Sequence, residues 1–296
     1  MLSILIPTYN YCIFPLVNAL QKQCEENNFT YEIIGIDDGS KSVLNLENDS
    51  INLLENCVFI SLSENIGLSE NRNLLAAKAK YSNLLFLDGD SIIIASNYIK
   101  NYLNNIETND IVYGGRVHPK RITSSKQKLR WKYGRNIEDK TSNQRNSSVY
   151  KTLMFNNTVI KKSCFDQIKF DSNLKKYGHE DTLFAYQVSL LNLKVLHIEN
   201  AIEHGAIDES AVFISKVKNS LNNLILLDKE NKIKPSFIKM LSLYHVLKDY
   251  KLQYFVAYFF NVSNKILYKQ LVSKNPSLFL FNLYRLGYFC SISSKI

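Results

Sequence analysis

Residues 1–40, MLSILIPTYNYCIFPLVNALQKQCEENNFTYEIIGIDDGS, contain the pattern that decides the fold class. Two β-branched apolar runs, residues 3–7 and 33–36, each end in a polar segment. Apolar residues at helical spacing occupy residues 14–27 between them. A strand, a helix and a second strand in this order predict a βαβ unit, in which the two strands lie parallel.

The alternation of strands and helices continues toward the middle of the chain. The third and fourth strands are predicted at residues 58–61 and 83–87, with a helix at residues 68–80 between them. Further helices or strands are predicted at residues 96–104, 110–113, 153–160, 180–191 and 195–198. This order indicates an α/β domain with a mainly parallel sheet flanked by helices, in which ligands bind at the carboxyl ends of the strands.

The polar and basic residues 118–148 interrupt this pattern. A loop-rich stretch of this length is either disordered or a loop that contacts substrate. Within it, Trp131 and Tyr133 have rings that can stack on a sugar, and they equally suit an apolar core. We therefore expect an irregular segment here, with both alternatives open for its aromatic residues.

Composition restricts the class of protein. The chain has 296 residues, 46% apolar and 21% charged, so it can bury a large core and is neither disordered nor collagen-like. Its 5 cysteines form no CxxC pair, which disfavours a disulfide framework and a thiolate zinc site. The N-terminal run lacks a basic leader, and residues 254–262 are too short to cross a bilayer, which needs about 20 apolar residues. We expect a reduced, cytoplasmic protein.

The net charge of +9 is concentrated near the C-terminus. Residues 236–296 contain eight basic residues and one acid, Asp249, among Phe, Tyr and Leu at near-helical spacing. We expect a helical extension over residues 231–296 after a first domain over residues 1–230. A basic, aromatic extension is more typical of contact with an anionic membrane, here the inner face of the cell membrane, than of a nucleic-acid groove. A helical subdomain that completes the core, or a homodimer interface, is the alternative.

Two polar clusters follow the first two predicted strands. They comprise Pro7, Thr8, Tyr9 and Asn10 after the first strand, and Asp37, Asp38, Gly39 and Ser40 after the second. A ring, a hydroxyl and two carboxylates at this edge can hold a nucleobase by stacking and by accepting its imide N–H. Alternatively, the polar residues form Asx turns that cap helices, and the residues alone support both interpretations equally.

The segment ENIGLSENRN, residues 64–73, leads into the helix after the third strand. Asn65 and Gly67 lie in its turn, where a glycine allows a tight bend. Arg72, one turn into the helix, can face inward toward an anion or a carboxylate such as Asp37. A solvent-facing helix charge is the alternative for Arg72.

Asp88, Gly89 and Asp90 directly follow the apolar run LLFL. Two carboxylates that flank a glycine at the carboxyl end of a strand can bind one divalent cation, which bridges a diphosphate. A hairpin turn is the alternative, but it needs a partner strand directly afterwards. Because helical spacing follows residues 91–94 instead, metal binding is favoured.

Two acids and a histidine complete the set of candidates. Glu180 and Asp181 follow Gly178 and open a largely apolar helix. Acids there commonly complement the helix dipole, but an acid at the mouth of a buried helix can also act as a general base. His204 follows the next strand, where a lone histidine is more often structural than a ligand.

These segments, in this order, resemble the family 2 glycosyltransferases of the GT-A fold. The matching features are PTYN, DDGS, an NxGxxxxRN segment, a DxD after an apolar strand, an ED pair that opens a helix, and a downstream His. The resemblance covers roughly residues 1–230. It implies a Rossmann-like nucleotide-sugar-binding domain of the inverting, bacterial polysaccharide or lipopolysaccharide type.

The resemblance also implies a role for each matching residue. Uracil and ribose would be framed by Thr8, Tyr9, Asp37 or Asp38, and Arg72, in a nucleotide-sugar site that includes Pro7, Asn10, Asn65, Gly67, Asp88 and Gly89. Mn²⁺ or Mg²⁺ would be held by Asp88, Asp90 and His204. Asp181 would be the catalytic base, with Glu180 as the alternative.

The implied reaction moves a hexosyl or N-acetylhexosaminyl group from a nucleotide sugar, expected to be UDP-linked, to a hydroxyl of a glycan or lipid-linked glycan. A single base suffices for one in-line displacement, which inverts the anomeric centre. An inactive relative that binds a sugar, a nucleotide or a membrane is the alternative. A nucleotidyltransferase is disfavoured because PTYNYCIF contains no glycine. No nucleic-acid partner is expected.

Overall fold

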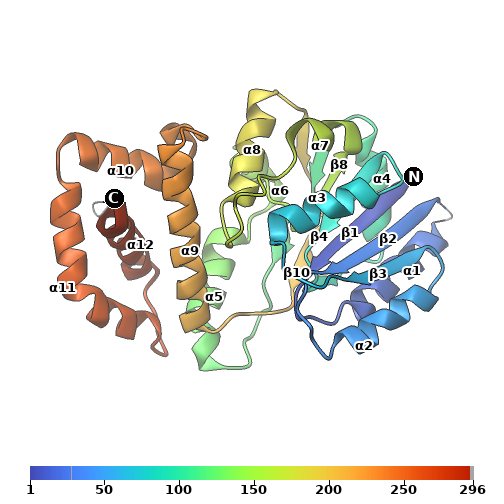
Figure 1. Cartoon of the computed structure of the whole chain (residues 1–296), viewed down its shortest axis with the longest axis horizontal. Helices are drawn as coiled ribbons and strands as arrows, with labels where there is room; N and C mark the ends of the chain where they lie inside the picture. The colour runs from blue at the N-terminus through green and yellow to red at the C-terminus, as the bar shows by residue number, and fades with distance from the viewer. Residues whose placement is uncertain (28, 294–296) are drawn as a thin grey trace. The chain divides into compact units, whose positions relative to one another are not determined.

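The protein, described by a computed structural model over residues 1–27 and 29–293, divides into two compact units. The first contains Met1–His118, Asp139–Lys175 and Glu180–Ala206, and the second contains Pro119–Glu138, Lys176–His179 and Ile207–Ile296 (Figure 1). The second unit thus contains the chain from Ile207 onward, and so begins before the expected domain boundary at residue 231. Helix α9 (Ser210–Lys229) belongs to the second unit because it packs against α12 (Leu278–Ser293).

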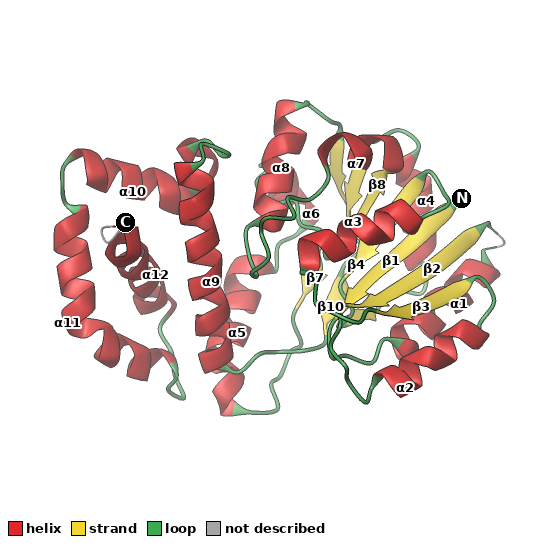
Figure 2. Ribbon diagram, in the orientation of Figure 1, coloured by secondary structure: helices red, strands yellow, loops and turns green. Residues whose placement is uncertain are grey.

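The first unit is built on a seven-stranded sheet with the order β3-β2-β1-β4-β8-β6-β9 (Figure 2). Its strands are β1 (Leu2–Thr8), β2 (Tyr31–Asp37), β3 (Cys57–Ser61), β4 (Asn83–Leu87), β6 (Ile111–Tyr113), β8 (Asn157–Lys161) and β9 (Val195–His197). The pairs β1–β2, β2–β3, β1–β4 and β6–β9 are parallel, and β8 runs antiparallel to β4 and β6. The prediction of a mainly parallel sheet is confirmed.

Helices cover both faces of this sheet, which explains why every residue of β1 and β2 is buried. Residues of α1 (Phe14–Glu26) and α4 (Tyr98–Ile106) pack with Ile4 and Ile6 on one face. On the other face, Phe86 packs against Phe155 and Phe165. The remaining helices of this unit are α2 (Asn45–Asn48), η1 (Asp49–Leu53), α3 (Leu68–Lys78), α6 (Ser142–Asn146), α7 (Lys162–Ile168) and α8 (Glu180–Leu190).

A second, three-stranded sheet lies beside the end of β4. It consists of β5 (Ser91–Ile93), β10 (Ile202–His204) and β7 (Arg116–Val117), in that order. Strand β5 corrects the prediction that no strand follows Asp90, yet it pairs antiparallel with β10 and not with β4. The turn after β4 is therefore not a β4–β5 hairpin.

The order of the strands reverses at β1 and β4. The chain runs from β1 outward to β2 and β3 on one side and then returns to β4 on the other side of β1. Ligands of open α/β sheets bind outside the carboxyl ends of strands at such a reversal. The ends of β1 and β4 carry Thr8 and Asp88, so the topology brings two of the predicted site segments together.

The second unit is helical. Its elements are η2 (Ser125–Gln127), α5 (Lys128–Tyr133), η3 (Gly134–Glu138), α9, η4 (Pro235–Phe237), α10 (Lys239–Asp249), α11 (Gln253–Leu271) and α12. Leu129, Phe213 and Phe281 lie in its core. No helix in the described part of the chain is long and apolar enough to span a membrane.

Residues 118–148 are ordered, which corrects the expectation of an irregular segment. They contain η2, α5, η3 and α6, and capping boxes at Ser124 and Thr141 start η2 and α6. Tyr133 packs against Phe213 and Phe281 in the core of the second unit. Helices of three to six residues are too short to show a hydrophobic period in the sequence, because they depend on tertiary packing for their stability.

Candidate active site

The carboxyl ends of β1 and β4 are in direct contact. A Cβ atom on Gly89 would lie 2.9 Å from Oγ1 of Thr8 and 3.0 Å from Cγ2 of Ile13, so a larger residue would force the side chain of Thr8 to shift. Packing therefore favours a glycine between Asp88 and Asp90, in addition to any contact with a ligand. This contact joins the PTYN and DGD segments into one edge.

Asp90 and His204 lie side by side because two strands pair. In the β5–β10 ladder, His204 stands opposite Ser91, the residue after Asp90. The Gly205 N–H donates to the Asp90 carbonyl at 2.8 Å, and Nε2 of His204 lies 3.5 Å from Oδ2 of Asp90. The predicted association of these two residues thus has a structural basis in the three-stranded sheet.

A second histidine, His118, which the sequence did not single out, stacks on His204. The two ring centroids are 5.4 Å apart and the ring planes differ by 14°. His118 follows β7, which pairs in parallel with β10, so the register carries the two histidines to neighbouring positions. Nδ1 of His118 lies 2.6 Å from Oδ1 of Asp139, and the His118 N–H donates to the other carboxylate oxygen at 3.1 Å. No sequence motif contains both His118 and Asp139, so the sequence did not indicate that His118 lies at the site.

Arg72 connects two of the predicted acids. Its side chain is almost fully buried, Nη1 donates to Oδ1 of Asp181 at 2.6 Å, and Nη2 donates to Oδ1 of Asp88 at 3.0 Å. Burial opposes the charged form of Arg72, but Asp181, Asp88 and Glu180 outweigh it and raise its pKa above the ordinary value. Arg72 therefore stays charged. It faces inward as predicted, but its partners are Asp88 and Asp181 rather than Asp37.

Asp181 is held from two sides at the start of α8. Its Oδ2 accepts the Phe155 N–H at 3.1 Å, while Oδ1 accepts from Arg72. An ionised carboxylate offers about four lone-pair sites, so each oxygen can accept one further hydrogen bond. The side chain of Asp181 is 15% exposed, whereas Glu180 beside it is buried. Of these two acids, Asp181 is better placed to meet a reactant.

Asp38 ties the end of β2 to the start of α3. Its carboxylate accepts the Ile66 N–H at 2.7 Å and the Gly67 N–H at 3.0 Å, at the positive end of the helix. Burial raises the pKa of Asp38, and Asp37 adds to this effect, although the two backbone N–H groups oppose it. Nδ2 of Asn65 donates to the Asp38 carbonyl at 3.0 Å. These bonds directly support the alternative that Asp38 shapes a turn and caps a helix.

The carboxylate of Asp37 likewise accepts hydrogen bonds from within the protein. It is fully buried, and its Oδ2 accepts from Ser40 N–H at 2.9 Å and from Asn45 Nδ2 at 3.0 Å. Its Oδ1 accepts the Asn10 N–H at 3.4 Å, and this bond joins the loops after β1 and β2. Asn10 has a φ of 53° and Pro7 lies within buried β1. Tyr9, by contrast, is 60% exposed and free to stack on a planar group.

Asp90 and His204 offer donor atoms that suit a divalent cation. Asp90 supplies a carboxylate and His204 an imidazole nitrogen, two ligand types that bind divalent metals. Asp88 uses Oδ1 for Arg72, and the described residues contain no group of three His, Cys, Asp or Glu side chains arranged for a metal ion. The pair fits a cation that takes further oxygen ligands from a bound diphosphate, as Mg²⁺ commonly does.

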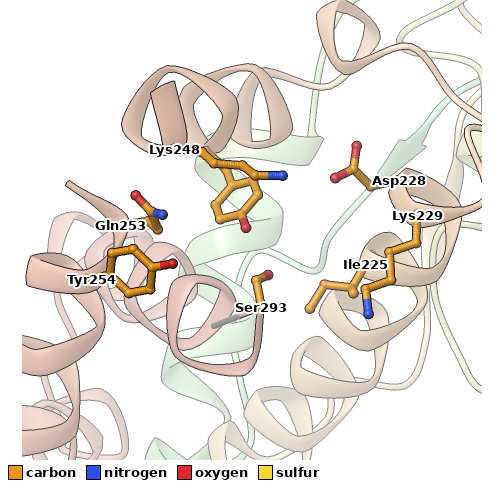
Figure 3. Close-up of a pocket in the computed structure, with 8 residues that line it drawn as sticks. Ile225, Asp228, Lys229, Lys248, Gln253, Tyr254 and Ser293 are labelled. Atoms are coloured by element: carbon orange, nitrogen blue, oxygen red, sulfur yellow. The ribbon is translucent and has the colours of Figure 1, made fainter. Parts of the chain in front are cut away.

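One pocket in the second unit lies among helices that carry none of the predicted site residues. It has a volume of about 240 Å³ and is lined from α9, α10, α11 and α12. Figure 3 shows Asp228 of α9 and Lys248 of α10 at its edge, and Asp228 also lies 2.8 Å from Nε2 of His245. The lining mixes polar and apolar side chains, and its residues belong to no sequence motif noted above.

The comparisons with known proteins fit the fold and the order of these segments. Residues 3–168 match the family Glycosyl transferase family 2. The chain belongs to this family. No curated protein has a significantly similar sequence.

Several solved structures resemble this glycosyltransferase in fold. S. aureus TarS has 22% identity and a TM-score of 0.50 over 76% of this chain, which spans only 39% of TarS. TarS 1–349 in complex with UDP-GlcNAc has 18% identity and a TM-score of 0.53, with 99% of this chain and 91% of that chain covered. Mannosyltransferase PcManGT from Pyrobaculum calidifontis, in complex with GDP-Man and Mn²⁺, has 14% identity and a TM-score of 0.55, with 99% and 86% covered. These likenesses confirm the GT-A fold.

Proposed function

We propose that this glycosyltransferase moves a sugar from a nucleotide-sugar donor to a hydroxyl of a glycan or lipid-linked glycan, with inversion at the anomeric carbon. The family match carries this proposal, and the cluster of Asp88, Asp90, Arg72, Asp181 and His204 at one sheet edge supports it. Complexes of similar folds with UDP-GlcNAc and GDP-Man are consistent with a nucleotide-sugar donor.

The nucleoside binds at the ends of β1 and β2. Exposed Tyr9 stacks on the base, and Thr8 and Asn10 line the same edge. Asp37 and Asp38 shape this edge through their bonds to Asn10 and Gly67, so they act on the nucleoside mainly by fixing the loops. Uracil is the base we expect.

The diphosphate binds near Asp88, Asp90 and His204. These residues would hold Mn²⁺ or Mg²⁺, with Asp90 and His204 as the closest pair of donors. The cation, when bound, neutralises charge on the departing nucleoside diphosphate. His118 keeps the ring of His204 in position by stacking, and Asp139 fixes His118.

Asp181 takes the proton of the acceptor hydroxyl. The acceptor oxygen then forms a bond to the anomeric carbon, the bond from that carbon to the phosphate oxygen breaks, and the electron pair leaves with the nucleoside diphosphate. One base and one displacement invert the anomeric centre. Arg72 orients Asp181 and Asp88 by its two hydrogen bonds, so it acts as a positioning residue.

Release of nucleoside diphosphate from a panel of UDP- and GDP-sugars, with Mn²⁺ and without acceptor, tests the donor class. We expect hydrolysis of one or a few UDP-sugars that disappears in EDTA. A panel in which no nucleotide sugar binds by calorimetry or is hydrolysed would contradict the proposal. The anomer formed with a glycan acceptor, read by NMR, tests inversion.

A further inference from the structure

Helix α11 carries a continuous apolar stripe that faces solvent. Phe255, Phe259, Val262 and Ile266 follow one another at steps of four, three and four residues, so they lie on one helix face. Their exposed fractions are 62, 52, 68 and 73%. The buried residues of α11, such as Phe260, lie on the opposite face. Four large apolar side chains in one exposed row exceed the scattered apolar residues of an ordinary surface.

The stripe borders a shallow groove between α11 and α12. The groove has a volume of about 260 Å³, and its lining includes Phe255 and Phe259 from α11 and Leu283 from α12. Gly287 of α12 lets the two helices approach, because a Cβ there would lie 2.7 Å from Cβ of Phe260. The apolar surface therefore extends beyond one helix into a continuous depression.

Basic residues lie along one flank of this stripe, and the acid nearest to it in the sequence is Asp249, before the helix. Lys265 and Lys269 project from one flank of α11, and Lys251 lies just before its first turn; all three are exposed. Residues 250–296 contain six basic residues and no acidic residue. Exposed Tyr258 lies on the same flank as the lysines. The surface thus combines apolar, aromatic and cationic groups.

This charge pattern distinguishes among the possible occupants. A two-fold dimer through the stripe would bring the same lysines of two copies to one interface, where like charges repel. An anionic lipid surface attracts lysines at its headgroups and accepts aromatic and aliphatic side chains at the acyl boundary. Tyrosine is also enriched at that boundary. Charge complementarity therefore favours a lipid bilayer.

We propose that α11 is a docking surface for an anionic lipid bilayer. The helix lies in the plane of the interface, with Phe255, Phe259, Val262 and Ile266 inserted and Lys251, Lys265 and Lys269 at the headgroups. The inference rests on the α11 surface alone and does not depend on the sugar-transfer reaction. It assigns this helix a role that the catalytic residues do not share.

Sedimentation of the full-length chain with vesicles tests the proposal. We expect pelleting with 3:1 phosphatidylcholine–phosphatidylglycerol vesicles and little with pure phosphatidylcholine, and weaker pelleting as salt increases. The double variants F255Q/F259Q and K265E/K269E should each lower the partition coefficient at least tenfold. Matched control variants on the first unit are L46Q/L53Q, which changes two exposed leucines, and K22E/K78E, which makes the same change in charge. Both should pellet like the wild type.

Circular dichroism melting of each variant separates loss of docking from loss of folding. A folded F255Q/F259Q variant that pellets like the wild type overturns the proposal, as does equal pelleting with neutral and anionic vesicles. Analytical ultracentrifugation without vesicles tests whether the stripe instead forms a dimer. A stable dimer that F255Q/F259Q dissociates, together with no vesicle binding by the wild type, assigns the stripe to a second copy of the chain and overturns the lipid assignment.

Discussion

Nη1 of Arg72 lies 2.6 Å from Oδ1 of Asp181, although 109 positions separate the two residues in sequence. Nη2 of the same guanidinium bonds Asp88, so the helix after β3, the end of β4 and the start of α8 meet at one charge. A buried arginine between two carboxylates is stable only when all partners are present, because each unpaired charge is costly to bury.

Replacement of Arg72 tests this arrangement. We expect Arg72→Met to lower the free energy of unfolding by about 3–5 kcal/mol, because it leaves Asp88 and Asp181 without their shared counter-charge. Urea unfolding followed by circular dichroism measures the change. Arg121→Met, at an exposed position, is the control and should change stability by no more than about 0.5 kcal/mol. Equal stability of both variants would show that the bridge is not needed for folding.

Replacement of Asp181 tests the proposed base. We expect Asp181→Asn to lower turnover by about 100-fold or more, since a positioned proton acceptor contributes about that factor. Donor affinity, measured by calorimetry, should remain within about threefold, and Asp166→Asn, at an exposed position on α7, should be fully active. Joint loss of donor binding and turnover would make Asp181 a structural residue, and near-normal turnover would assign the base role to Glu180 or another group.

The Asp90–His204 pair predicts metal-dependent binding of nucleoside diphosphate. We expect UDP to bind with Mn²⁺ and not with EDTA, and we expect Asp90→Ala or His204→Ala to remove the metal-dependent part. Without a cation, the diphosphate would face Asp88 and Asp90 directly. His245→Ala, on α10 in the second unit, is the matched histidine control. Calorimetric affinity that is equal with Mn²⁺ and with EDTA would disprove metal dependence.

The buried His197 predicts a loss of stability in acid. Burial lowers the pKa of His197 to about 4, although the Val149 carbonyl bonded to Nε2 partly opposes this shift. The unfolded chain binds a proton at this residue below about pH 6.5 and the folded protein only below about pH 4. The contribution of neutral His197 to the free energy of unfolding is therefore complete above pH 6.5 and is lost as the pH falls toward 4.

Urea unfolding midpoints between pH 7 and pH 4 measure this dependence. Because carboxylates also titrate in acid, the wild type is compared at each pH with His197→Gln, whose amide keeps a donor near Val149. The informative quantity is the difference between their free energies of unfolding. We expect that difference to narrow by on the order of 2 kcal/mol from pH 7 to pH 4, since the variant lacks the titrating ring. A difference that does not change with pH would mean that His197 is not held neutral.

The sequence by itself determined the framework of β1 to β4, although not the short helices α2 and η1 between β2 and β3. The apolar runs of β1 to β4 and the helical spacing of α1 and α3 predicted these elements to within two or three residues, because a buried strand or amphipathic helix repeats its pattern locally. It also predicted which segments lie together beyond the strands, since parallel strands present their carboxyl ends at one edge of the sheet. The roles of individual site residues stay predictions.

Only the tertiary structure decided the partners of the polar residues. Arg72 bonds Asp88 and Asp181 rather than Asp37, His118 stacks on His204, and residues 118–148 fold into short helices. Strands β5, β7 and β10 are two or three residues long, so they carry no recognisable period. These contacts join residues far apart in the chain, and sequence patterns record only what repeats over one or two turns of a helix or a few residues of a strand. The pairing of distant charges and rings depends on how the strands align, and only the folded chain fixes that alignment.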